Sequence, residues 1–239
     1  MSPLRASSPP RVEIFSRHAF FSTVSAHKKR PAHFTREKCF QNLLATTDFS
    51  KAHLHILFDL ARGPREKHFL HRETRFPIVE FAGGTESASF LFLLDYVTKL
   101  SLDPETILYF VEDDYFHRPG WLDLLLEGFS LPKADYITLY DHPDKYLLPQ
   151  QSEVFTTDSC HWRTTPSTTN TFAVRLQTLL ADLPIHRKFS LNCDISQDHK
   201  KFLALGKKGR TLLSSIPGGS THAEPDFISP CISWELFLH

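Results

Sequence analysis

Three consecutive carboxylates, Glu112, Asp113 and Asp114, follow directly after the apolar run at residues 107–111. Ligands of open α/β sheets bind beyond the carboxyl ends of the strands, and the triplet lies at such an end. Adjacent carboxylates repel one another and are costly to bury without a counter-charge. A hard divalent cation would supply that charge, and oxygen ligands favour Mg²⁺ or Mn²⁺, often together with substrate phosphates. The alternative interpretation is a solvated acidic turn.

Glycines and basic residues suggest where an anion would bind. Gly83, Gly84 and Thr85 stand between an apolar segment and a helical pattern, and the backbone N–H groups at a helix start attract anions. The alternative is a plain strand-to-helix turn. The basic group made of Arg17, Lys28, Lys29 and Arg30 would hold a nucleotide or a diphosphate, or else forms a solvated loop.

A long irregular segment at residues 141–170 offers further binding groups. Loops of this length within a compact domain are usually functional. Trp162, Thr169 and Asn170 lie in this segment. They are candidates for acceptor contacts, because aromatic faces and hydroxyl-binding groups suit a carbohydrate.

The elements that must position these residues alternate in type through the first 140 residues. Strands are expected at 12–15, 54–60, 78–81, 107–111 and 136–140, and helices begin at Thr35, Thr85 and Pro119. Such alternation predicts a mostly parallel central sheet with helices on both faces.

The second half of the chain is more mixed. We expect a hairpin around 156–165, strands at 171–174 and 212–216, and helices at 176–181 and 199–205. This pattern predicts an antiparallel addition to the sheet. The length of 239 residues favours one domain at 11–239, preceded by a disordered Ser/Pro-rich lead-in at 1–10.

Composition narrows the function class. Lys plus Arg and Asp plus Glu both number 27. The chain therefore lacks the excess of basic residues that would indicate a nucleic-acid partner. No apolar run approaches the roughly 20 residues that span a bilayer. The four cysteines are widely scattered, which favours free thiols in a reducing compartment. We therefore expect a cytoplasmic protein, with peripheral contact to a membrane left open.

Four landmarks of one fold family occur here in the family's order. They are the Gly-rich turn at 81–85, the acidic motif at 112–114, Asp198 at the start of a later helix, and His222 after Gly218-Gly219. The chain thus resembles nucleotide-sugar-dependent glycosyltransferases of the GT-A fold, of a bacterial, family-2-like type. The resemblance implies a single Rossmann-like GT-A domain with a mixed C-terminal half. The acidic motif, usually D-x-D, is Glu-Asp-Asp in this chain.

The resemblance also implies roles for these residues. Asp114 and His222 would hold Mn²⁺ or Mg²⁺, while Asp113 and Glu112 would contact the donor. Asp198 would be the general base of an inverting transfer, taking the proton of the acceptor hydroxyl. Two alternatives stay open: His222 as a loop histidine bonded to backbone, and Asp198 as a simple helix cap.

The function implied by the resemblance is transfer of a sugar from a UDP- or GDP-sugar to a hydroxyl group of a carbohydrate or glycolipid acceptor, in glycan biosynthesis. One alternative is a nucleotidyltransferase on a related fold, although the N-terminal sequence lacks the Gly-rich, Lys-containing phosphate loop expected of one. The other is a catalytically inactive carbohydrate-binding relative.

Overall fold

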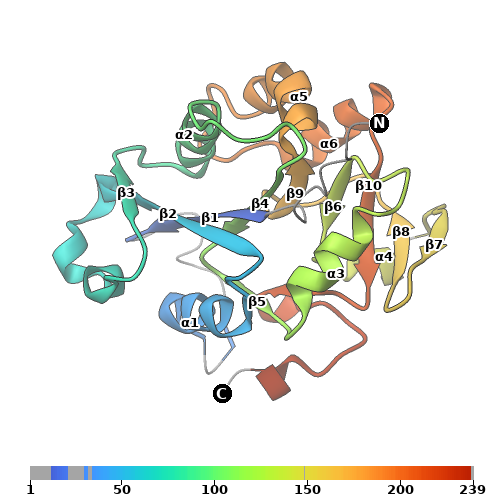
Figure 1. The fold of residues 1–239 in the computed structure, drawn as a ribbon, viewed down its shortest axis with the longest axis horizontal. Coiled ribbons are helices and arrows are strands. Elements are labelled where there is room, and N and C mark those ends of the chain that lie inside the picture. Colours follow the sequence, from blue (N-terminus) through green and yellow to red (C-terminus); the bar gives the residue numbers. More distant parts are fainter. Residues whose placement is uncertain (1–11, 21–29, 32–33, 148, 238–239) are drawn as a thin grey trace, which may run out of the picture.

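The computed structural model describes residues 12–20, 30–31, 34–147 and 149–237, so the expected lead-in lies outside the described part. Within that part, one sheet has nine strands in the order β3-β2-β1-β4-β9-β6-β10-β8-β7 (Figure 1). The strands are β1 (Val12–Ala19), β2 (Ala52–Asp59), β3 (Ile78–Phe81), β4 (Ile107–Glu112), β6 (Tyr136–Thr138), β7 (Val154–Thr156), β8 (His161–Thr164), β9 (Phe172–Arg175) and β10 (Leu212–Ile216). Two more, β5 (Tyr115–His117) and β11 (Ser220–His222), form a separate antiparallel pair.

Strand direction divides the sheet into two halves. In the first half, β1 pairs in parallel with both β2 and β4, and β2 pairs in parallel with β3. In the second half, β9 runs antiparallel to β4 and β6, and β8 runs antiparallel to β10 and β7, while β6 and β10 pair in parallel. The expectation of a parallel first half with antiparallel additions is confirmed.

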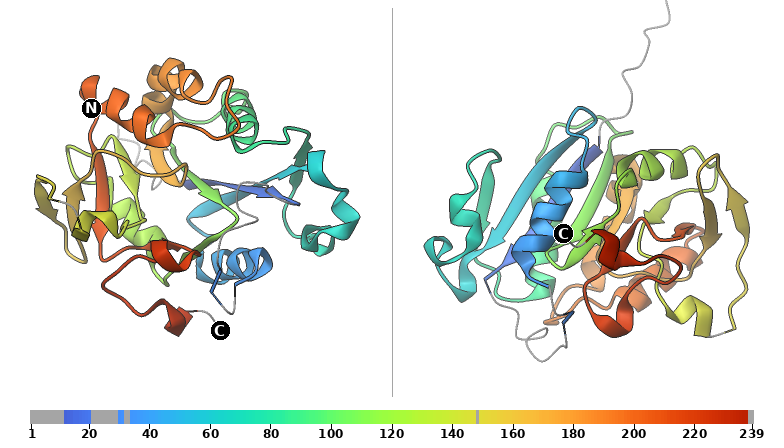
Figure 2. Two further views of the ribbon diagram at one scale, coloured as in Figure 1. Left: turned by 180° about the vertical axis from the view of Figure 1, so that it is seen from behind. Right: turned by 90° about the horizontal axis from the view of Figure 1, so that it is seen from below.

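Helices cover both faces of the sheet, as the alternating pattern predicts. In Figures 1 and 2, α1 and α3 lie on one face, and α2, α5 and α6 lie on the other. The helices are α1 (Arg36–Thr46), α2 (Glu86–Val97), α3 (Trp121–Gly128), α4 (Asp144–Leu147), α5 (Leu176–Lys188) and α6 (Asp198–Lys207). Among the described residues, no helix combines the length and the apolar character needed to cross a bilayer.

Side-chain caps fix where two of these helices begin. The Thr35 hydroxyl accepts the backbone N–H of Lys38 at 3.0 Å, and the Thr85 hydroxyl accepts that of Ala88 at 3.1 Å. Each bond satisfies one backbone donor that the first helical turn leaves unpaired. At α3, Gly120 is the cap residue instead, with a positive φ of 80°.

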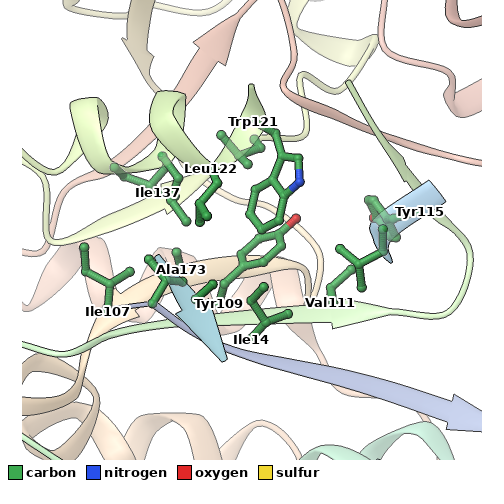
Figure 3. Packing of buried hydrophobic residues seen from close by; sticks show 14 of the residues in the cluster. Ile14, Ile107, Tyr109, Val111, Tyr115, Trp121, Leu122, Ile137 and Ala173 are labelled. Carbon is green, nitrogen blue, oxygen red and sulfur yellow. The ribbon is translucent and has the colours of Figure 1, made fainter. Parts of the chain in front are cut away.

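The first five residues of β4, at 107–111, are apolar, and both faces of the strand are buried over this stretch. Ile107, Tyr109 and Val111 pack toward α3 in one core cluster. Figure 3 shows the Tyr109 ring beneath the Trp121 indole, with ring centroids 5.0 Å apart. Leu108 and Phe110 belong to the cluster on the opposite face. This burial fixes the end of β4 and therefore the position of the carboxylates that follow it.

Candidate active-site cleft

A cleft of about 380 Å³ lies at the carboxyl ends of β1, β2 and β4. It brings together most of the site residues expected from the sequence. Those in its lining are Arg17, Gly84, Thr85, Glu112, Asp113, Asp114, Thr169, Asp198 and His222.

Asp114 is the most heavily paired carboxylate of the triplet. Its Oδ2 atom lies 3.1 Å from Nε2 of His222 and 2.9 Å from a guanidinium nitrogen of Arg30. Burial acts to raise the pKa of Asp114, but His222 and Arg30 outweigh it and hold this pKa well below its usual value. Asp114 is therefore an anion, which is the form that a metal ligand requires.

Asp113 points toward the start of α1 instead. Its Oδ1 atom lies 2.9 Å from Nε of Arg36, and its Oδ2 atom accepts the backbone N–H of Ala19 at 3.3 Å. Burial raises the pKa of Asp113 despite the Arg36 partner. Adjacent aspartates thus face two different basic side chains.

Glu112 shares one guanidinium with Glu86 of α2. The two terminal nitrogens of Arg17 each lie 3.1 Å from a carboxylate, one from Glu86 and one from Glu112. Burial raises the pKa of Glu112 to about 8. For Glu86, burial is outweighed by Arg17 and by hydrogen bonds from the Ser196 amide and the Asn170 side chain, so its pKa is lowered. One cation therefore favours a single negative charge on this pair.

Asp198 is the first residue of α6, and its side chain makes a salt bridge. The cap position belongs to Gln197, which makes no side-chain cap bond. The Asp198 carboxylate lies 3.0 Å from Nζ of Lys201, which is fully buried and lies 4.3 Å from the centre of the Phe90 ring. Burial raises the pKa of Asp198, although Lys201 acts in the opposite direction. A carboxylate with a raised pKa is a better proton acceptor.

The glycine turn differs from the expected phosphate cradle. The backbone N–H groups of Gly83 and Gly84 donate to the Asp59 carboxylate at 2.9 and 2.7 Å. Asp59 is the last residue of β2 and the register partner of Phe81 at the end of β3, so its side chain contacts the turn that follows β3. Gly84 has a φ of 81°, which favours glycine at this position. In this structure these amides donate to a side-chain carboxylate of the protein itself, and this pairing stabilises the turn.

The three expected acceptor residues lie in different surroundings. Thr169 lines the cleft, and its hydroxyl lies 2.8 Å from that of Tyr115. Asn170 is fully buried behind the cleft, where it contacts Glu86 and Lys201. Trp162 is fully buried in the core, and its Nε1 donates to Thr157. The expected acceptor contact of Trp162 is therefore wrong, because its indole packs within the domain.

The basic group is described only in part. Arg17 lines the cleft, and Arg30 contacts Asp114 at its edge, while Lys28 and Lys29 fall outside the described residues. The sequence reasoning did not single out Arg36, Asp59, Glu86 or Lys201. Glu86 directly follows a capping threonine, so it resembles an ordinary acidic residue of a first helical turn. Only the fold reveals the partners of these side chains.

The donor atoms fit a divalent ion that a ligand helps to bind. Among the described residues, no group of three or more His, Cys, Asp or Glu side chains is placed to hold a metal alone. Asp114 and His222 supply one oxygen and one nitrogen next to each other. Such a pair suits Mn²⁺ when phosphate oxygens and water complete the coordination.

The fold is that of a glycosyltransferase-like α/β domain. One solved structure with this likeness is GalNAc-T7 with UDP, GalNAc and Mn²⁺, at a TM-score of 0.62 and 9% sequence identity. The match covers 93% of this chain and 46% of that chain, so this chain spans about half the length of its structural relative. At this identity the likeness establishes a shared fold. No protein-family model and no curated protein matches the sequence.

Proposed function

We propose that this protein is a metal-dependent glycosyltransferase that moves a sugar from a UDP- or GDP-sugar to a hydroxyl group of a carbohydrate or glycolipid acceptor. The observation that carries the proposal is the pairing of Asp114 with His222 in the cleft that Asp198 also lines. The shared fold with a glycosyltransferase whose structure contains UDP and Mn²⁺ supports the same conclusion.

Asp114 and His222 are the proposed metal ligands. A bound Mn²⁺ or Mg²⁺ would neutralise charge on the leaving nucleoside diphosphate. Arg17 and Arg36 place two further positive charges in the cleft lining. Arg36 pairs with Asp113, and Arg17 lies between Glu86 and Glu112, whose raised pKa favours its neutral form. This lining therefore repels an incoming diphosphate less strongly than unpaired carboxylates would.

Asp198 is the proposed general base of an inverting transfer. It would accept the proton of the acceptor hydroxyl as that oxygen attacks the anomeric carbon. The salt bridge to Lys201 fixes the carboxylate, and burial raises its pKa above the usual value. The proton acceptor is thus both oriented and more basic than an exposed aspartate.

A panel of UDP- and GDP-sugars tests the proposal. We expect calorimetry to detect binding of at least one donor in the presence of Mn²⁺, and we expect EDTA to abolish it. Product formation with mono- and disaccharide acceptors then separates an enzyme from an inactive carbohydrate-binding relative. If no donor binds with Mn²⁺, the proposed function is wrong.

A further inference from the structure

Arg30 is in direct contact with Asp114, one of the two proposed metal ligands. One guanidinium nitrogen contacts Oδ2 of Asp114 at 2.9 Å, and the other donates to the backbone carbonyl of Ala223 at 2.8 Å. The guanidinium also lies over the Phe34 ring, 4.5 Å from its centre. Three contacts from three segments hold this side chain, so it is far more constrained than an ordinary surface arginine.

The two polar contacts of Arg30 are made with the two chain segments that carry the proposed metal ligands. Asp114 is one proposed ligand, and Ala223 directly follows the other, His222. The Oδ2 atom that Arg30 contacts is also the atom nearest Nε2 of His222, at 3.1 Å. Arg30 and His222 therefore contact the same carboxylate oxygen of Asp114.

Building on the proposed function, we propose that Arg30 competes with the divalent ion for Asp114 and is released when the metal binds. Two cations repel each other at one carboxylate oxygen, so the metal must displace the guanidinium. Arginine does not lose its proton in proteins, so deprotonation cannot relieve the competition. The measured affinity for the metal alone is then the intrinsic affinity multiplied by the fraction of molecules in which Asp114 is free of Arg30.

The released guanidinium has a use in the same cleft. Its planar fork matches the oxygens of a diphosphate, which a donor would bring beside the metal. Donor and metal then favour each other's binding, since the donor stabilises the displaced position of Arg30. In this way Arg30 makes the affinity for the metal higher when a nucleoside diphosphate is bound than when it is absent.

A titration with Mn²⁺ alone, in which EPR measures the concentration of the free ion, tests this competition. We expect Arg30→Met to bind Mn²⁺ roughly tenfold more tightly than the wild type, within the range typical of coupled binding events. Arg36→Met is the matched control, because it removes a neighbouring positive charge whose salt bridge is with Asp113, whereas the salt bridge of Arg30 is with Asp114. Arg30→Lys, which keeps the charge but lacks the fork, is expected to lie between Arg30→Met and the wild type.

Several results would overturn the inference. One is an affinity of Arg30→Met for Mn²⁺ that equals or falls below that of the wild type. Another is an equal gain in Arg36→Met, which would indicate a general charge effect. Asp114→Asn separates this from the proposed function. If Asp114→Asn still binds Mn²⁺, the proposed metal site itself is wrong, whereas its loss of binding with no gain in Arg30→Met rejects only the competition.

Discussion

Nε2 of His222 lies 3.1 Å from Oδ2 of Asp114, although the two residues are far apart in the sequence. The backbone brings them together. His222 is the register partner of Tyr115 in the antiparallel pair of β5 and β11, and the Ala223 amide donates to the Asp114 carbonyl at 2.8 Å. The pair is thus positioned by regular strand hydrogen bonds rather than by a loose loop contact.

The first prediction concerns Asp114→Asn. An amide is a weaker ligand than a carboxylate, so we expect Mn²⁺ affinity to fall by about 100-fold or more, with a matching loss of sugar transfer. Asp123→Asn is the control, because Asp123 is exposed on α3 and forms a salt bridge with Lys51 at 2.7 Å. Calorimetry with Mn²⁺ and UDP would measure both variants. Equal metal affinity in the two would remove Asp114 from the site.

The sequence predicts most of this framework. The caps at Thr35 and Thr85 and the apolar run that forms β4 are local signals, and the structure confirms all three. These features can be predicted from the sequence because a cap bond and a strand buried on both faces each depend on a few neighbouring residues.

The partners of the site residues are not readable in this way. The Arg17 bridge to Glu112 depends on β1 pairing with β4, where these two residues are register partners. Likewise, Asp59 reaches the glycine turn only because β2 lies beside β3. Strand neighbours and register arise from packing of the whole sheet, which a local pattern does not specify. For the same reason the sequence favours a binding loop at Trp162, whereas the structure buries this side chain in the core.

The second prediction compares Glu112→Gln with Glu86→Gln in the presence of EDTA. The pKa of Glu112 is raised by burial to about 8 from an ordinary 4.5, so the folded protein holds a proton that the unfolded chain releases between these values. The free energy of unfolding from this group therefore falls as pH rises from about 4.5 to about 8. Glu112→Gln removes that loss, so we expect its free energy of unfolding to rise relative to that of the wild type as pH increases over this interval.

Glu86→Gln should behave in the opposite way. Despite burial, the pKa of Glu86 is lowered by Arg17 and by two hydrogen bonds, so its charge stabilises the fold above its unfolded pKa and this stability is lost as pH falls through the folded value. We expect Glu86→Gln to be less stable than the wild type at neutral pH. Urea denaturation at several pH values would measure both variants. Similar pH profiles for the two would contradict the shared-cation arrangement.

The third prediction concerns Lys201→Met and the pH dependence of transfer. Burial raises the pKa of Asp198, and Lys201 counteracts part of that rise. Without Lys201, the pKa of Asp198 should rise further. A general base acts in its ionised form, so the acid limb of kcat/KM should move to higher pH in Lys201→Met and stay near the wild-type position in Lys201→Arg. An unchanged limb in Lys201→Met would argue against Asp198 as the base.

The fourth prediction uses two glycine substitutions of opposite sign. A Cβ atom on Gly128 of α3 would lie 2.6 Å from the Trp162 ring and 2.7 Å from the Ile137 side chain, whereas one on Gly206 of α6 would meet nothing within 4 Å. Gly128→Ala forces a tightly packed core apart, and we expect a loss of about 1–3 kcal/mol in the free energy of unfolding. Gly206→Ala should gain up to about 1 kcal/mol, because alanine is the better helix former.

Urea denaturation of both alanine variants checks this contrast. Trp162 is fully buried, so movement of its indole in Gly128→Ala should change the combined fluorescence of the three tryptophans of the chain. A Gly128→Ala variant as stable as the wild type would mean that the Trp162 ring moves aside without a loss in the free energy of unfolding. Trp162 could then turn out of its place under α3, and its exclusion from the acceptor site would no longer hold. A clear loss at Gly128, beside a gain at Gly206, would instead establish that the indole is fixed in the core and unavailable to a ligand.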